Sequence, residues 1–108
     1  MSPHRACSLA EIPDQGALAV EVDGEPVALV RTGDEVFAIS DICSHADVPL
    51  SEGDVADCEI ECWLHGSRFD LRTGKPTGPP ASAPVPVFGA QVDGDDVFVD
   101  VSTPLNLT

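Results

Sequence analysis

The sequence of 108 residues predicts an all-β fold, a small antiparallel β-sandwich or barrel. Apolar and β-branched residues occur in runs of five or six that are separated by glycine-containing turns, which is typical of a meander of short strands. Apolar residues do not recur at helical spacing over more than a turn or two. Ten prolines and nine glycines agree with short strands and many turns.

The N-terminal part of the chain predicts three consecutive strands. Residues 17–22 lead into the turn Asp23-Gly24, residues 26–31 lead into a second glycine-containing turn, and residues 35–40 follow directly. Before them, residues 8–12 predict one short helical piece.

The C-terminal part predicts strands over residues 85–88, 90–92 and 97–101. The last of these alternates apolar and polar side chains, as a half-buried strand does. Pro84 and Pro86 lack the N–H group that a central strand donates, so we expect their strand to lie at an edge of the sheet.

Length and charge exclude several classes of protein. A chain of this length supplies one small core, and we expect a single domain over residues 1–108. Nineteen acidic residues against five basic ones give a net charge of −14, which argues against nucleic acid or an anionic membrane as a partner. No apolar run approaches the roughly 20 residues that span a bilayer, and the N-terminus lacks the apolar stretch of a signal peptide. We therefore expect a cytoplasmic protein.

Two short motifs carry the chemistry, and both lie in the loop-rich interval 41–80. Cys43-Ser44-His45 and Cys62-Trp63-Leu64-His65 each supply one thiolate and one imidazole, with sixteen residues between the motifs. Such a Cys2His2 set suits a tetrahedral zinc ion, or a two-iron, two-sulfide cluster with two cysteines on one iron and two histidines on the other. Each motif mixes the two ligand types and no helix follows, which favours the cluster over a zinc finger.

The remaining cysteines and histidine have simpler interpretations. Cys7 and Cys58 have no ligand-like partner at a matching spacing, and we expect both to be buried small apolar side chains. The Glu-Ile-Glu segment between Cys58 and Cys62 alternates as a strand would. His4 is expected to be exposed and inert.

With these motifs the sequence resembles the Rieske [2Fe-2S] proteins, and within them the small soluble Rieske ferredoxins of ring-hydroxylating oxygenase systems. The resemblance extends to Leu50-Ser51-Glu52-Gly53, to Gly66-Ser67-Arg68-Phe69-Asp70 and to Thr73-Gly74-Lys75. It implies a Rieske-type β-fold with two cluster-binding loops and a proline-rich loop that includes Pro79 and Pro80. The base would consist of residues 1–40 and 81–101, and the cluster-binding subdomain of residues 41–80.

The resemblance also implies a ligand set and a role. One Rieske-type [2Fe-2S] cluster would be held by Cys43, His45, Cys62 and His65. The protein would be a monomeric one-electron carrier in aromatic hydrocarbon catabolism, not an enzyme, and would pass electrons from a flavin-dependent reductase to a terminal non-haem iron oxygenase. The alternatives are a Rieske subunit bound to a larger oxidoreductase, and a zinc-stabilised interaction module without a redox role.

Differences from the respiratory Rieske proteins predict a low reduction potential. Val48 and Leu64 stand where that branch has two further cysteines joined in a disulfide, and Phe69 stands where it has a tyrosine. With fewer hydrogen-bond donors to the sulfur atoms, the reduced cluster is stabilised less. We therefore expect a reduction potential toward the low end of the Rieske range, which runs from about −150 to +300 mV.

Charged residues crowd the interval that contains the motifs. We expect the six acidic residues of this interval either to form a solvated face or to steer a basic partner. They are Asp47, Glu52, Asp54, Asp57, Glu59 and Glu61. Three of the five basic residues lie within eight positions, and we expect them either to pair with neighbouring acids or to form a docking rim; they are Arg68, Arg72 and Lys75.

Overall fold

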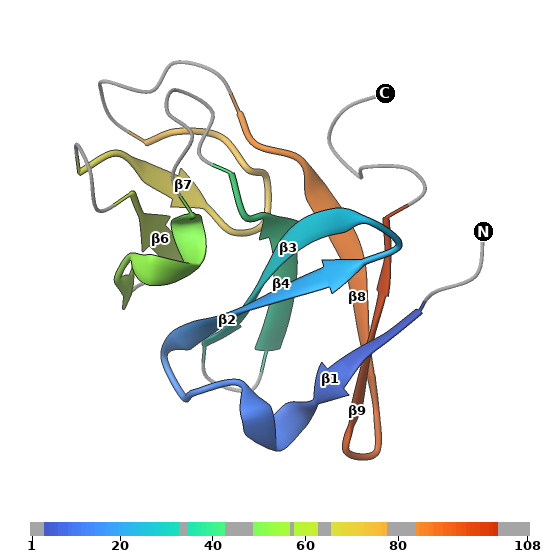
Figure 1. The fold of residues 1–108 in the computed structure, drawn as a ribbon. Helices are drawn as coiled ribbons and strands as arrows, with labels where there is room; N and C mark the ends of the chain where they lie inside the picture. The colour runs from blue at the N-terminus through green and yellow to red at the C-terminus, as the bar shows by residue number, and fades with distance from the viewer. Residues whose placement is uncertain are drawn as a thin grey trace.

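The computed structural model describes six segments of the chain and is all-β, as predicted (Figure 1). The described residues are 4–32, 35–42, 49–56, 58–62, 66–77 and 84–101. The strands of the larger sheet are β1 (His4–Ser8), β2 (Gly16–Val22), β3 (Glu25–Thr32), β4 (Glu35–Ser40), β8 (Val87–Asp93) and β9 (Asp96–Asp100). Those of the smaller sheet are β5 (Val55–Ala56), β6 (Glu59–Glu61) and β7 (Arg68–Asp70). Two 3-10 turns complete the described elements, η1 (Leu9–Glu11) and η2 (Leu50–Glu52).

The larger sheet is antiparallel and nearly closed into a barrel. Its strand order is β1-β9-β8-β4-β3-β2, and its two edge strands, β1 and β2, approach each other. The smaller sheet has the order β5-β6-β7 and packs on the side of the barrel where η2 lies (Figure 1). No helix in the described segments is long and apolar enough to cross a bilayer.

The predicted meander of three strands is confirmed by β2, β3 and β4. The turn between β2 and β3 consists of Asp23 and Gly24, with φ of 51° and 81° and with Val22 opposite Glu25. Positive φ at both central residues is the mark of a type I′ turn, whose twist matches that of the flanking strands. The short helical piece is confirmed as the 3-10 turn η1.

The expected edge position of the proline-containing strand is wrong. β8 lies between β9 and β4, in the interior of the sheet. The strand begins at Val87, so both prolines precede it and the ladder loses no donor. Pro86 contributes only its carbonyl oxygen, which accepts a hydrogen bond from the Ser40 N–H at 2.9 Å. The expected strands 85–88 and 90–92 are one strand, which continues through Gly89.

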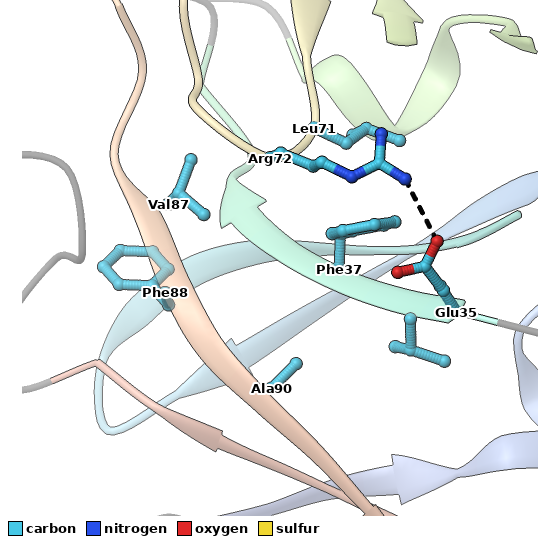
Figure 2. Close-up of a pocket in the computed structure, with 8 residues that line it drawn as sticks. Glu35, Phe37, Leu71, Arg72, Val87, Phe88 and Ala90 are labelled. Atoms are coloured by element: carbon cyan, nitrogen blue, oxygen red, sulfur yellow. Dashed lines mark hydrogen bonds and ion pairs between the residues drawn. The ribbon is translucent and has the colours of Figure 1, made fainter. Parts of the chain in front are cut away.

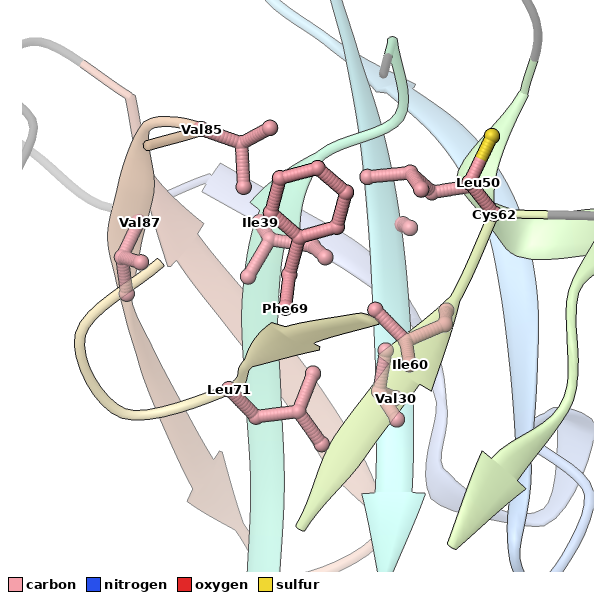
Figure 3. Packing of buried hydrophobic residues seen from close by; sticks show 10 residues of the cluster. Val30, Ile39, Leu50, Ile60, Cys62, Phe69, Leu71, Val85 and Val87 are labelled. Carbon is pink, nitrogen blue, oxygen red and sulfur yellow. The ribbon is translucent and has the colours of Figure 1, made fainter. Parts of the chain in front are cut away.

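Two apolar clusters fill the molecule, and β3 contributes to both because its side chains alternate between the faces of the sheet. The barrel cluster fills the curl of the larger sheet and consists of Cys7, Ile12, Val22, Val27, Leu29, Ala38, Phe88, Val97 and Val99. The inter-sheet cluster joins the smaller sheet to the larger one and consists of Ala28, Val30, Ile39, Leu50, Ile60, Cys62, Phe69, Leu71, Val85 and Val87 (Figure 3).

Candidate metal centre

The first motif is carried on a segment whose two ends are fastened together. Residues 43–48, which include Cys43, His45 and Val48, lie outside the described residues. On either side of them, Ile42 and Pro49 form an antiparallel β-bridge. The carbonyl oxygen of Asp41 accepts a hydrogen bond from the Leu50 N–H at 2.6 Å. The described residues just before the first motif, 41–42, are therefore held beside those just after it, 49–50.

The second motif begins at the end of β6, where Cys62 is fully buried. Its N–H donates to the carbonyl oxygen of Ser67 at 2.6 Å, and its own carbonyl oxygen accepts from the Gly66 N–H at 2.8 Å. These two hydrogen bonds tie Gly66 and Ser67 to Cys62. Trp63, Leu64 and His65 lie outside the described residues.

Backbone contacts bring the two motifs together. Gly53, just after η2, packs so closely against β6 that a Cβ atom placed on it would lie 1.6 Å from the Glu61 carbonyl oxygen. The Glu61 N–H in turn donates to the Asp54 carbonyl oxygen at 2.9 Å. Gly53 therefore lets the chain that follows the first motif approach the strand that precedes the second.

Side-chain packing also brings the end of the first motif close to the start of the second. Leu50 and Cys62 are both fully buried and belong to the inter-sheet cluster. In Figure 3 the Cys62 sulfur lies beside Leu50 and points away from Ile60. The thiol of the second motif therefore lies next to the returning end of the first.

A third connection starts from the same region. The Thr77 N–H donates to the Arg68 carbonyl oxygen at 2.8 Å, and the Val85 N–H donates to the Gly74 carbonyl oxygen at 2.9 Å. These bonds fix the two ends of the proline-rich segment beside β7. Residues 78–83, including Pro79 and Pro80, lie outside the described residues. The described ends of all three connections gather at the upper left of Figure 1.

Two of the three basic residues near the motifs, Arg68 and Arg72, are paired with acids, which is one of the two expected outcomes. Arg68 lies between Glu59 and Glu61, with N–O distances of 3.5 and 3.4 Å. Arg72 contacts Glu35 at 3.2 Å. For Lys75 no ion pair occurs with the described residues.

Four of the six acidic residues form a surface beside the motif ends, which we call the acidic face: Glu52, Asp54, Glu59 and Glu61. Glu52 and Asp54 are exposed, and the other two are partly exposed on β6. One guanidinium, that of Arg68, opposes these four carboxylates, so the face remains negative. Asp47 and Asp57 lie outside the described residues.

Of the two further cysteines, one meets the expectation and the other does not. Cys7 is buried in the barrel cluster as expected, and burial raises the pKa of its thiol. Cys58 is only partly buried and occupies the turn before β6 with a φ of 62°. Cys58 is not fully buried because Arg72 Nη1 donates a hydrogen bond to its Sγ at 3.0 Å, which holds the sulfur atom at the surface. Partial burial raises the pKa of Cys58, against the opposing charge of Arg72, so this thiol is neutral at pH 7.

His4 is exposed on β1, as expected. Among the described residues no group of three or more His, Cys, Asp or Glu side chains is arranged to hold a metal ion.

Sequence reasoning did not foresee a pocket of about 380 Å³ between β4, β8 and the turn after β7 (Figure 2). Arg72 spans its mouth, paired with Glu35 and lying 5.6 Å from the centre of the Phe37 ring. The other lining side chains are apolar; they are Val36, Leu71, Val87, Phe88 and Ala90. Because its two charged groups neutralise each other, the pocket offers no nucleophile and no free acid or base.

The chemistry of the donor set fits a two-iron cluster. Each motif supplies one thiolate and one imidazole, and Cys62, the one candidate ligand that the structure describes, is fully buried in an apolar cluster. Thiolate ligation of iron suits such a dry site, and an imidazole on the more exposed side suits the second iron.

Comparison with known proteins agrees with this fit. The sequence profile of the Rieske [2Fe-2S] domain matches residues 2–89. The chain is 41% identical over 101 residues to the ferredoxin component of biphenyl 2,3-dioxygenase from Rhodococcus jostii RHA1, with 94% of each chain covered. The solved ferredoxin of carbazole 1,9a-dioxygenase from Nocardioides aromaticivorans IC177 is 42% identical and matches with a TM-score of 0.87 over 92% of this chain and 97% of that one. A solved complex of reduced oxygenase and oxidised ferredoxin in carbazole 1,9a-dioxygenase contains a chain that is 33% identical, with a TM-score of 0.81 over 88% of this chain and 89% of that one.

The contact at Gly53 predicts a steric requirement for glycine. Its φ of −87° suits any residue, so only the Glu61 carbonyl oxygen excludes a side chain. We expect Gly53→Ala to lower the free energy of unfolding by about 1–3 kcal/mol and to speed the loss of bound iron. Gly89→Ala is the matched control, because nothing lies within 4 Å of its added Cβ. Chemical denaturation and iron release measure both effects, and equal behaviour of the two variants would contradict the contact.

Proposed function

Because this chain belongs to the Rieske [2Fe-2S] domain family, we propose that it is a one-electron carrier that serves a terminal non-haem iron oxygenase. The observation that carries the proposal is the position of Cys62, fully buried and packed beside the returning end of the Cys43-x-His45 motif. The family profile and the ferredoxin relatives confirm the resemblance seen in the sequence.

We assign the cluster to Cys43, His45, Cys62 and His65. When bound, a cluster of this type supplies a one-electron redox couple. The protein's own part is to fasten the ends of both motifs, to keep water from Cys62 and to hold the two motif ends against each other. The zinc-stabilised module remains the alternative that metal analysis distinguishes.

Relatives with a described role support the direction of electron flow. Relatives that are 41–42% identical and matched over most of their length are ferredoxin components of dioxygenases, which are electron-transfer components rather than catalytic ones, and one solved structure is a complex of an oxygenase with its ferredoxin. We propose that this chain, as a cytoplasmic monomer, accepts an electron from a flavin-dependent reductase and delivers it to such an oxygenase.

The expected low reduction potential stays a prediction. The structure is compatible with it at one position, since Phe69 is fully buried in the inter-sheet cluster and carries no hydroxyl group to donate to a sulfur atom.

Replacing cysteines one at a time tests the ligand set. Cys62→Ser removes a proposed ligand, so we expect loss of the cluster, seen as loss of iron, acid-labile sulfide and red-brown colour. Cys58→Ser is the matched control, four residues earlier in the chain, and should keep all three. Zinc in the wild-type protein, or a cluster that persists in Cys62→Ser, would contradict the assignment.

The acidic face predicts electrostatic steering of a basic partner. The double variant Glu52→Gln, Asp54→Asn removes two exposed charges beside the motif ends, so we expect its reaction with cytochrome c, a basic electron acceptor, to slow several-fold at low salt. Stopped-flow measurements at increasing ionic strength should show a weaker salt dependence than for the wild type.

The charge-matched control is Asp93→Asn, Asp95→Asn, which removes two exposed carboxylates around the β8–β9 turn, at the opposite end of the barrel (Figure 1). Its rates should stay close to those of the wild type. If both double variants slow the reaction with cytochrome c equally, the net charge of the protein alone determines the rate and the acidic face has no special role.

A further inference from the structure

We propose that Asp41 is the positioning residue of the first ligand motif. Its side chain clasps the segment that returns from the motif, and thereby sets the position of Cys43 and His45 relative to Cys62. This inference rests on the ligand set proposed above, and it adds a residue outside that set.

Asp41 makes three hydrogen bonds to two separate parts of the chain, the start of β3 and η2. Its N–H donates to the Pro26 carbonyl oxygen at 3.1 Å, which ties it to the start of β3. Its carbonyl oxygen accepts from the Leu50 N–H at 2.6 Å, and its Oδ1 accepts from the Ser51 N–H at 2.8 Å. The carboxylate therefore satisfies an N–H group in the first turn of η2, where Pro49 offers no side-chain cap.

The hydrogen bonds of Asp41 are linked to the second motif through the contacts of η2. Leu50, whose N–H is held by Asp41, is fully buried in the same cluster as Cys62. At the other end of η2, Gly53 lies against the Glu61 carbonyl oxygen, one residue before Cys62. A shift of η2 would thus move the return of the first motif away from the strand that presents the second.

Buried polarity in the described residues is confined to the motif ends. The barrel cluster is entirely apolar, and the buried polar or charged residues of the described segments are Ser40, Asp41 and Ser67. Ser40 and Asp41 precede the first motif and Ser67 follows the second. A buried carboxylate is costly unless it is hydrogen-bonded, so its presence at 7% exposure marks a place where geometry matters more than stability.

The acceptor oxygen, rather than the bulk of the side chain, should therefore determine the geometry. Asp41→Asn keeps an oxygen acceptor of the same shape, whereas Asp41→Ala removes it. We expect the reduced Asp41→Ala protein to give a shifted and broadened electron paramagnetic resonance signal, and to lose its iron to a chelator about tenfold faster than the wild type. Asp41→Asn should keep the wild-type line shape and release iron within about twofold of the wild-type rate.

A stability-matched control separates positioning from general loss of stability. Val97→Ala opens the fully buried core of the barrel, remote from the motif ends, and destabilises the fold without touching the clasp. It should leave the line shape unchanged. If Asp41→Ala keeps the wild-type line shape, or loses iron no faster than Val97→Ala at equal stability, the inference is overturned. Should Asp41→Ala fail to fold, Asp41→Leu, which has a similar size and no acceptor, takes its place in the same comparison.

Hydrogen exchange separates this inference from the proposed function. In Asp41→Ala the amide groups of residues 50–53 should exchange faster, while those of β8 and β9 stay protected. If the wild-type protein binds no iron and sulfide, the proposed function fails. If iron and sulfide are bound but neither exchange at 50–53 nor the line shape responds to Asp41, only the positioning role fails.

Discussion

The approach of one backbone to another, at Gly53 and Glu61, is the constraint on which the candidate centre depends. The two motifs lie sixteen residues apart in the sequence, and their described ends come together because the chain after the first touches the strand before the second. A side chain at position 53 would force these segments apart. The hydrogen bond from the Glu61 N–H to the Asp54 carbonyl oxygen holds the same approach from the other side.

The molecule divides its stabilising interactions between two regions. The barrel relies on an apolar cluster and on regular antiparallel pairing, which are tolerant of small changes in side-chain position. The smaller sheet is short and irregular, and it is positioned by individual hydrogen bonds and by the inter-sheet cluster. Cys62 belongs to that cluster, so the packing that joins the two sheets also places a proposed ligand.

Strands with strong local signals were predictable from the sequence. The Asp23-Gly24 turn and the alternation of residues 97–101 correspond to elements that the structure contains. β1 was missed because His4 and Arg5 give no apolar alternation, and it forms only by pairing with β9 at the far end of the chain. β5 and β7, of two and three residues, were missed because such short strands carry no periodicity and exist through their contacts with β6.

The ligand types of the candidate centre could be predicted from the sequence, but the contacts that position them could not. Spacing and ligand type were enough to propose the four ligands, because iron and zinc impose those residue types. The roles of Gly53 and Asp41 could not be predicted, since a backbone contact and a buried clasp depend on segments that meet only in the folded chain. Cys58 was misjudged for the same reason, because its partner Arg72 lies fourteen residues away.

Anomalous X-ray diffraction from crystals of the purified protein, recorded at the iron absorption edge, would locate bound iron directly. We predict iron bonded to Cys62 Sγ, with a second iron adjacent to it and ligated by the histidines of both motifs. A single zinc ion at this position, or iron bound at Cys7 or Cys58 instead, would contradict this prediction.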